Sequence, residues 1–379
     1  MNVARLSFRK KIALELFRRY RKNEARLHPL NYILWECTLR CNLQCLHCGS
    51  DCRKESAVKD MPAGDFLRAL DELKGLVYPH KTMIVLTGGE ALMRNDLTQI
   101  GQQLYAREFP WGLVTNGLLL QKNRLESLLA SGLRAVTVSL DGLEAAHNWL
   151  RGTATGFQKA LSAIRLLAQT PGIRFDVVTC ANRNNIGELP QLKTLLRQTG
   201  VKQWRIFTIF PVGRAKMHEA LQLEPKNFRA LFEFIRQTRK EGKIKLNYGC
   251  EGFLGNYEGA VRDQLFYCRA GITIASVLAD GSIAACPNLR ANFIQGNIYK
   301  DHFADVWQNR YRVFRDKSWT KTGHCAACKF FRYCEGNGMH LRDEQTGQLL
   351  FCHLKRLEEK PKEKDRSRFS PLVSANRPE

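Results

Sequence analysis

Strand-like and helix-like segments alternate from about residue 30 to residue 209, and this alternation constrains the fold more than any other feature of the sequence. Six repeats of this kind predict a parallel sheet with helices outside it, either an open doubly wound sheet or a partly closed barrel. Ligands bind at the carboxyl ends of the strands in both arrangements. The expected strands are Tyr32–Glu36, Met83–Leu86, Gly112–Thr115, Ala135–Ser139, Phe175–Thr179 and Trp204–Ile209. The expected helices are Asp65–Leu76, Asp96–Glu108, Arg124–Ala130, Gly156–Ala168, Glu188–Gln198 and Phe228–Glu241.

Residues 1–29 form a separate basic segment before the alternating region. From Leu6 to Arg26 the pattern predicts an amphipathic helix, with apolar residues at i, i+4 spacing: Phe8, Ile12, Leu16 and Tyr20. A basic helix of this kind can lie on an anionic membrane surface or bind a partner. It can also pack its apolar stripe on the body of the protein, and the sequence leaves both readings open.

The segment that follows the last expected barrel helix has a different composition. Residues 246–354 are rich in glycine, cysteine and aromatic residues, which indicates a small domain organised by metal. Residues 355–379 are charged, contain prolines and show no periodicity, so we expect a disordered tail. The expected domains are therefore 1–29, 30–245, 246–354 and 355–379.

Charge and cysteine content narrow the class of protein. The formal net charge is +23, which fits an acidic partner such as an acidic peptide, a polycarboxylate, an anionic membrane or nucleic acid. The sequence has neither an apolar run of about 20 residues nor an export signal, so we expect a cytoplasmic location. In that reducing compartment, 13 cysteines at clustered spacings indicate metal ligation or catalysis.

Three cysteines stand at C-x3-C-x2-C spacing directly after the first expected strand: Cys41, Cys45 and Cys48. Three thiolates on one loop can converge on a [4Fe–4S] cluster and leave one iron without a protein ligand. The alternative is a zinc site completed by His47.

This cysteine loop resembles that of the radical SAM superfamily, which implies a partial (β/α)6 TIM-type barrel. In that family the open iron binds S-adenosylmethionine, and an external electron donor reduces the cluster. The sulfonium is then cleaved to a 5′-deoxyadenosyl radical, which abstracts a hydrogen atom from the substrate. His47 stands where the family places a ring beside the cofactor, which favours the cluster over zinc.

Further matches to the family follow the next three strands. Gly88, Gly89 and Glu90 match the Gly-Gly-Glu motif that receives the ammonium group of the cofactor, although Ala91 replaces the usual proline. The resemblance also assigns Asn116, after the third strand, and Ser139, at the end of the fourth, to cofactor binding. Asp141, Arg151 and the sequence Pro211-Val-Gly213-Arg214 resemble the family as well, the last in its peptide-modifying members.

The C-terminal cysteines resemble the SPASM domain, a small iron–sulfur extension of peptide- and protein-maturing members of the family. By that resemblance one auxiliary [4Fe–4S] cluster is held by four cysteines, Cys325, Cys328, Cys334 and Cys352, and the alternative is a zinc ribbon.

A second auxiliary site departs from the family pattern, because Gly338 stands where the family has a cysteine. Cys268 and Cys286 remain as candidate ligands, and Cys250 is a plausible third. A cube with an open iron, a cluster completed by a group such as His340, and a smaller or absent cluster all stay open.

The resemblance implies an oxidoreductase, and we expect it to modify a peptide or protein, with an acidic segment bound by the basic surface. The alternatives are modification of a porphyrin or haem precursor and, last, a non-catalytic zinc or cluster protein that binds nucleic acid, although no base-reading motif is present. The sequence from Trp35 to Arg53 also resembles an uncharacterised radical SAM/SPASM subgroup of Bacteroidetes thought to be paired with a lipoprotein. No side chain can be assigned as the catalytic acid or base.

Overall fold

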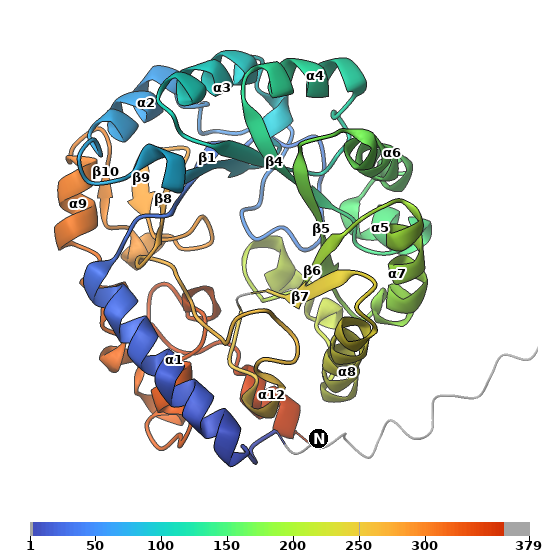
Figure 1. Cartoon of the computed structure of the whole chain (residues 1–379), viewed down its shortest axis with the longest axis vertical. Helices are drawn as coiled ribbons and strands as arrows, with labels where there is room; N and C mark the ends of the chain where they lie inside the picture. Colours follow the sequence, from blue (N-terminus) through green and yellow to red (C-terminus); the bar gives the residue numbers. More distant parts are fainter. Residues whose placement is uncertain (1–2, 250, 360–379) are drawn as a thin grey trace, which may run out of the picture.

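A computed structural model of the chain describes residues 3–249 and 251–359. Strands β1 to β7 lie side by side in chain order, and all are parallel. The sheet curves into a partial barrel with the helices outside it (Figure 1). These strands are β1 (Tyr32–Thr38), β2 (Met83–Gly88), β3 (Trp111–Thr115), β4 (Leu133–Ser139), β5 (Arg174–Ala181), β6 (Gln203–Thr208) and β7 (Lys245–Tyr248).

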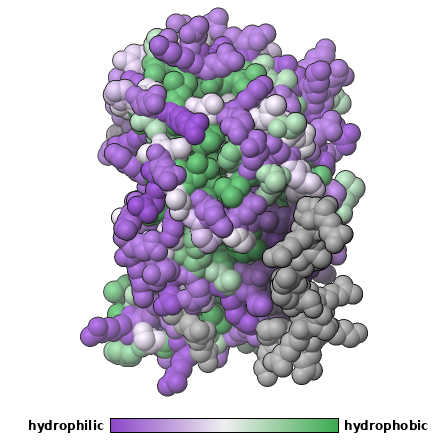
Figure 2. Space-filling model, turned by 90° about the vertical axis from the view of Figure 1, so that its right-hand side faces the viewer, coloured by the Kyte–Doolittle hydropathy of each residue, from purple (hydrophilic) through white to green (hydrophobic). Residues whose placement is uncertain are grey.

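Seven helices connect the barrel strands: α2 (Ala63–Asp71), α3 (Leu97–Ala106), α4 (Lys122–Ala130), α5 (Glu144–Arg151), α6 (Gly156–Gln169), α7 (Leu189–Gln198) and α8 (Pro225–Glu241). Most of them bury an apolar face, as α6 does with Leu161, Ile164 and Leu167, whereas α5 buries His147 and Arg151 beside Leu150. Their exposed residues are mostly polar, and on the side of the molecule that carries α5 to α8 hydrophilic residues surround a central band of hydrophobic ones (Figure 2). The fold is the α/β partial barrel that the sequence predicted. The six expected strands are present with boundaries shifted by at most two residues, and β7 is a seventh strand that was not expected.

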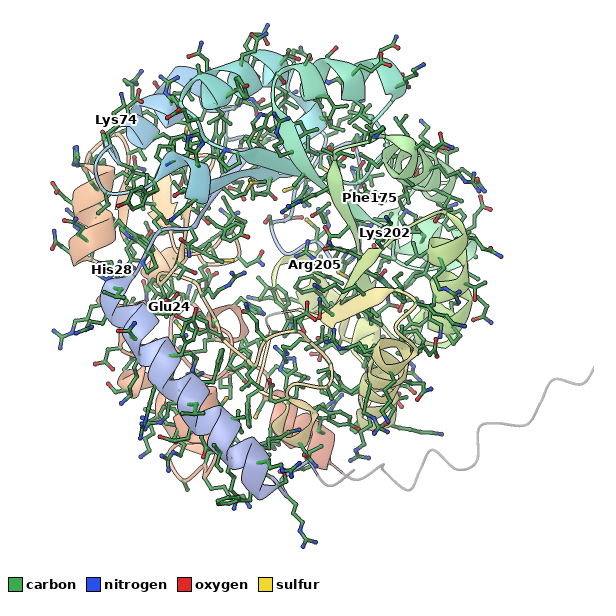
Figure 3. The ribbon with its side chains drawn as sticks, in the orientation of Figure 1. Glu24, His28, Lys74, Phe175, Lys202 and Arg205 are labelled. Atoms are coloured by element: carbon green, nitrogen blue, oxygen red, sulfur yellow. The ribbon has the colours of Figure 1, made fainter. Side chains whose placement is uncertain are left out.

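Side chains alternate between the two faces of the barrel strands. In β6, Trp204 and Ile206 are fully buried against the helices, whereas Arg205 and Phe207 face inward and stay partly exposed. Arg205 lies toward the centre of the barrel (Figure 3). The same alternation in β4 leaves Thr137 partly exposed on the inner face. A complete TIM barrel fills its interior with side chains, and this partial barrel leaves its interior accessible.

The C-terminal part extends the same sheet at the other edge of β1. Strand β8 (Ile274–Val277) pairs in parallel with β1, and a hairpin continues the sheet through β9 (Ser282–Ala284) and β10 (Gly296–Asn297). Four short helices follow: α9 (Phe303–Asn309), α10 (Arg312–Arg315), α11 (Phe331–Cys334) and α12 (His353–Glu358). Leu354 and Leu357 of α12 are buried, so the ordered part ends later than residue 354, and residues 360–379 of the expected tail lie outside the described residues.

Helix α1 (Phe8–Leu27) lies along the C-terminal segments, shown in orange and red in Figure 1. Ser7 caps its first turn, and His28 ends it in the left-handed conformation. The apolar stripe of this helix points to solvent, so the reading in which it packs on the protein's own body is wrong. Across the described residues, no helix has both the length and the apolar character needed to cross a membrane.

Candidate functional site

The loop that follows β1 carries the three motif cysteines in a buried setting. Cys41 and Cys45 are buried and Cys48 is partly buried, and the backbone N–H of Cys41 donates to the carbonyl of Arg53 at 2.6 Å. The pKa of Cys41 is raised to about 12, mainly by burial and in smaller part by the nearby sulfurs of Cys45 and Cys48. Thiols this close together would be stabilised as thiolates only by a bound cation.

The distances between the sulfur atoms of these three cysteines distinguish a zinc site from a cluster site. In one tetrahedral zinc site, sulfurs lie about 3.8 Å apart. Among the described residues, only one group of three His, Cys, Asp or Glu side chains has all its ligand atoms within 4.8 Å of one another, namely His47, Asp141 and Cys180. The loop cysteines are more widely spaced, as expected when each binds a different iron of one cube. The loop therefore fits an iron–sulfur cluster better than zinc.

The Gly-Gly-Glu segment at the end of β2 is bound to the backbone that leads into the cysteine loop. Gly89 N–H donates to the carbonyl of Thr38 at 2.8 Å, and Glu90 N–H donates to that of Arg40 at 2.9 Å. A Cβ atom at Gly88 would overlap the carbonyl oxygen of Thr38, and one at Gly89 that of Arg40. Glycine is thus required at both positions, because the end of β2 and the segment that leads into the cysteine loop lie too close together for a Cβ atom.

The Glu90 carboxylate is fully buried and accepts three hydrogen bonds from the chain itself. The donors are Leu92 N–H at 3.1 Å, the Thr115 hydroxyl at 2.8 Å and Asn116 N–H at 2.7 Å. Burial raises the pKa of Glu90, and these hydrogen bonds oppose the rise. Its visible role is to join the ends of β2 and β3.

Asn116 and Ser139 occupy the ends of the next two strands, as the resemblance implied. The side-chain amide of Asn116 donates to Asn42 Oδ1 in the cysteine loop at 2.7 Å. Ser139 is the last residue of β4 and is partly buried. Asn116 therefore orients the loop directly, a contact that its family resemblance did not reveal.

A buried ion pair lies beside Cys45. Arg151 Nε donates to Asp141 Oδ2 at 2.6 Å, and Arg151 Nη1 lies 3.6 Å from Cys45 Sγ. Asp141 also accepts from Cys180 N–H at 2.7 Å, and Arg151 keeps the pKa of Asp141 low despite burial. Burial lowers the pKa of His47 to about 4, so this ring is neutral. The cysteine loop is thus joined to the ends of β4 and β5.

The loop after β6 holds the cysteine loop from another side. Arg214 Nε donates to the carbonyl of Cys45 and Arg214 Nη1 to that of Cys52, both at 2.9 Å. Arg214 N–H donates to the carbonyl of Cys48 at 3.0 Å. Gly213 has φ +60°, and its missing Cβ is what allows this approach. The Gly213-Arg214 pair is therefore a clamp on the cysteine loop.

Four C-terminal cysteines line one small cavity: Cys325, Cys328, Cys334 and Cys352. Burial raises the pKa values of Cys334 and Cys352, and the sulfurs of Cys325 and Cys328 add to both shifts. As in the loop, no three of these sulfurs all lie within 4.8 Å of one another, whereas the sulfurs of one tetrahedral zinc site lie about 3.8 Å apart. The four residues therefore fit a second cluster better than a zinc ion.

The candidate second auxiliary site is only partly described. Cys268 precedes β8 and Cys286 follows β9, so both lie at the same end of one antiparallel hairpin. Cys250 lies outside the described residues. A Cβ atom at Gly338 would lie 2.5 Å from the carbonyl oxygen of Glu251, so the cysteine usual in the family does not fit here without movement.

The structure shows where two cysteines outside the motifs, Cys37 and Cys52, lie. Cys37 lies near the end of β1 and is fully buried in the core. Cys52 is buried beside the loop, and its thiol lies close enough to that of Cys48 to raise the pKa of Cys52 and lower that of Cys48. The four-residue interval from Cys48 to Cys52 was the only sequence signal for this contact.

Two family models match this chain. The model described as the radical SAM superfamily matches residues 35–193, and the SPASM model, described as an iron–sulfur cluster-binding domain, matches residues 268–329.

Relatives of known activity match over most of their length. An AdoMet-dependent heme synthase of Methanosarcina barkeri is 27% identical over 330 residues, which cover 80% of this chain and 90% of that protein. The mycofactocin maturase MftC of Mycolicibacterium smegmatis is 26% identical over 313 residues, covering 81% of this chain and 77% of that protein. The structure of anSMEcpe with bound AdoMet and Cp18Cys peptide superimposes with a TM-score of 0.67 at 19% identity, over 87% of this chain and 94% of that chain.

Proposed function

The chain is a radical SAM enzyme with a SPASM domain, and from that premise we propose that it modifies a peptide or protein substrate. When bound, a [4Fe–4S] cluster with S-adenosylmethionine supplies a 5′-deoxyadenosyl radical, which abstracts a hydrogen atom from an unactivated carbon. Cys41, Cys45 and Cys48 would hold that cluster. Gly88, Gly89, Glu90, Asn116 and Ser139 would form the S-adenosylmethionine side of the site.

The residues around the loop keep it in one position. Asn116 binds the loop through Asn42, Arg214 binds two of its carbonyls, and Arg151 lies between Cys45 and Asp141. Since a radical reaction needs its partners held in a near-attack geometry, these contacts position the reaction at the mouth of the barrel.

The accessible barrel interior is the observation that carries the proposal. Inward-facing residues stay partly exposed on successive strands, among them Val85, Val114, Thr137, Val178 and Arg205. A substrate segment can therefore enter beneath the cysteine loop. The maturase among the relatives supports a peptide or protein, and the net charge of +23 favours an acidic segment.

The auxiliary cysteines suggest where the surplus electron goes. Hydrogen abstraction leaves a substrate radical, and closing a crosslink or a double bond releases one electron. Cys325, Cys328, Cys334 and Cys352 would hold the cluster that accepts it. Cys268, Cys286 and Cys250 are the proposed ligands of a second auxiliary cluster.

A tetrapyrrole is the second candidate substrate, and the heme synthase relatives favour it. The carboxylates of a porphyrin would also suit a basic protein. Radical abstraction beside such a carboxylate would yield a double bond and carbon dioxide, again releasing one electron.

One experiment separates the two substrates. The reconstituted protein is incubated without oxygen with S-adenosylmethionine, a reductant and either acidic peptides or coproporphyrin, and 5′-deoxyadenosine and substrate mass are followed. A mass change in a peptide supports the proposal, and loss of carbon dioxide from the porphyrin supports the alternative. A variant with Cys41, Cys45 and Cys48 replaced by alanine is the control. If it forms as much 5′-deoxyadenosine as the natural protein, the loop does not hold the reactive cluster.

A further inference from the structure

Helix α1 presents four large apolar side chains to solvent in one row. Phe8 is 76% exposed, Ile12 46%, Leu16 60% and Tyr20 51%. Soluble proteins scatter such residues singly, and a contiguous row indicates an interaction surface. With the exposed basic residues of the same helix, Arg9, Lys11, Arg19 and Lys22, they form what we call the α1 outer face.

The opposite side of α1 is fixed to the C-terminal part, so the helix cannot rotate to hide this row. Arg21 is buried and donates to the carbonyl of Tyr333 at 2.8 Å. Leu14 is buried, and Glu15 accepts from Arg332 at 2.7 Å. The α1 outer face is thus held outward by contacts along the length of the helix.

The charge on this surface has one sign. The acidic residues of α1 are Glu15 and Glu24, and neither is among its exposed residues. Glu15 is bound by Arg18 and Arg332, and Glu24 is partly buried. A second copy of this chain would bring a second positive face against the first, which disfavours self-association.

We propose that the α1 outer face docks on an anionic phospholipid surface. Phe8, Ile12, Leu16 and Tyr20 would enter the boundary between headgroups and acyl chains, where apolar side chains of interfacial helices are buried. The flanking arginine and lysine side chains would lie at headgroup level and bind lipid phosphates. This docking holds the enzyme at the membrane surface without a spanning segment. It does not depend on which substrate the enzyme modifies.

Vesicle flotation of the reconstituted full-length protein tests the proposal. We expect binding to vesicles of phosphatidylcholine mixed with phosphatidylglycerol, and little binding to phosphatidylcholine alone. In about 1 M salt, where screening acts over about 3 Å, binding should fall sharply. Ile12→Gln with Leu16→Gln should lower the partition coefficient at least about tenfold, since two apolar side chains leave the lipid boundary. Arg9→Gln with Arg19→Gln should lower it about fivefold for each charge removed.

The matched control carries Tyr78→Gln and Tyr105→Gln, which remove exposed aromatic rings (76% and 63%) outside α1. It should bind vesicles like the natural protein, and iron content and melting temperature should show that every variant is folded. Equal binding by the Ile12/Leu16 variant would mean nonspecific electrostatic adsorption and would overturn the proposal. So would failure of the natural protein to bind anionic vesicles at low salt. A dimer in light scattering that the Ile12/Leu16 variant abolishes would assign the face to a second copy instead.

Discussion

At the scale of single residues, the position of the cysteine loop depends on glycines, because only a residue without a Cβ atom lets a neighbouring backbone segment approach the loop so closely. The Gly213-Arg214 clamp contacts the carbonyls of Cys45, Cys48 and Cys52, which lie about 160 residues earlier in the chain. These contacts bind the backbone and leave the sulfurs to the cluster. The clamp therefore sets the position of the loop without supplying a ligand.

Gly213→Ala should loosen the first cluster, and Gly242→Ala is its matched control. Both glycines have positive φ, so each alanine costs about 1–2 kcal/mol of backbone strain. Only at Gly213 would the new Cβ also overlap the carbonyl oxygens of Cys48 and Gly49, whereas nothing lies within 4 Å at Gly242. That overlap should cost about 1–3 kcal/mol more and lower cluster retention at least about tenfold. Iron content and absorbance after reconstitution measure it, and equal iron in both variants would show that the clamp is dispensable.

Cys37 should stay unreactive until the protein unfolds. Its thiol is fully buried, and burial raises its pKa to about 12. The raised pKa favours the neutral thiol, so at pH 8 about one molecule in 10⁴ carries the reactive thiolate. Alkylation with iodoacetamide followed by peptide mass spectrometry should leave Cys37 unmodified between pH 7 and pH 9 and label it in denaturant. Rapid labelling of the native protein at pH 8 would contradict the burial described above.

At the scale of elements, apolar periodicity predicted six of the seven barrel strands because each has one face against helices, and it missed the short strand β7. The same reasoning missed α5, since the buried side of that helix carries His147 and Arg151 instead of an apolar row. It found α1 but could not tell which face is buried, because Arg21 and Leu14 anchor the helix while its apolar stripe stays outside. The pairing of β8 with β1 joins residues more than 200 positions apart, and no local pattern encodes it.

The elements that surround the four C-terminal cysteines should depend on metal more than the barrel does. Helix α11 ends at Cys334 and α12 begins after Cys352, so both helices are attached to the proposed cluster. Strands β3 to β6 and their helices are held by buried apolar residues such as Trp204, Leu161 and Leu128, which are not bound to the proposed cluster. Iron chelation should therefore raise amide exchange in residues 318–358 and leave β3 to β6 protected. Equal loss of protection in both parts would show that the two fold as one metal-dependent unit.

At the scale of the whole molecule, the short spacings between cysteines in the sequence were enough to reveal both sets of candidate ligands. The spacing could not reveal what surrounds them. Asp141, Arg151 and Cys180 come together from separate strands and helices, and Arg214 reaches Cys45 across 169 positions. A sequence motif identifies cofactor ligands that stand close together in the chain. The residues that hold those ligands in place are far apart in the sequence, and only the folded structure brings them together.

The two cysteine sets lie in different parts of the molecule. We therefore predict that cleavage of S-adenosylmethionine can be uncoupled from formation of the modified product. Cys41, Cys45 and Cys48 lie on the loop after β1, whereas Cys325, Cys328, Cys334 and Cys352 line a cavity beside α11 and α12. Cys328→Ala should therefore keep reductive cleavage of S-adenosylmethionine and lose the modified product, because the substrate radical has no electron acceptor. Cys45→Ala should lose both.

Counting 5′-deoxyadenosine and product in the same anaerobic reaction distinguishes these outcomes. Cys37→Ser, which changes a core cysteine outside both sets, is the control and should keep the ratio of product to 5′-deoxyadenosine found for the natural protein. If Cys328→Ala also keeps that ratio, the C-terminal cluster does not accept the electron, and its role is to hold α11 and α12 in place. Because the measured quantity is a ratio, a general loss of folded protein would lower both counts together and would not imitate uncoupling.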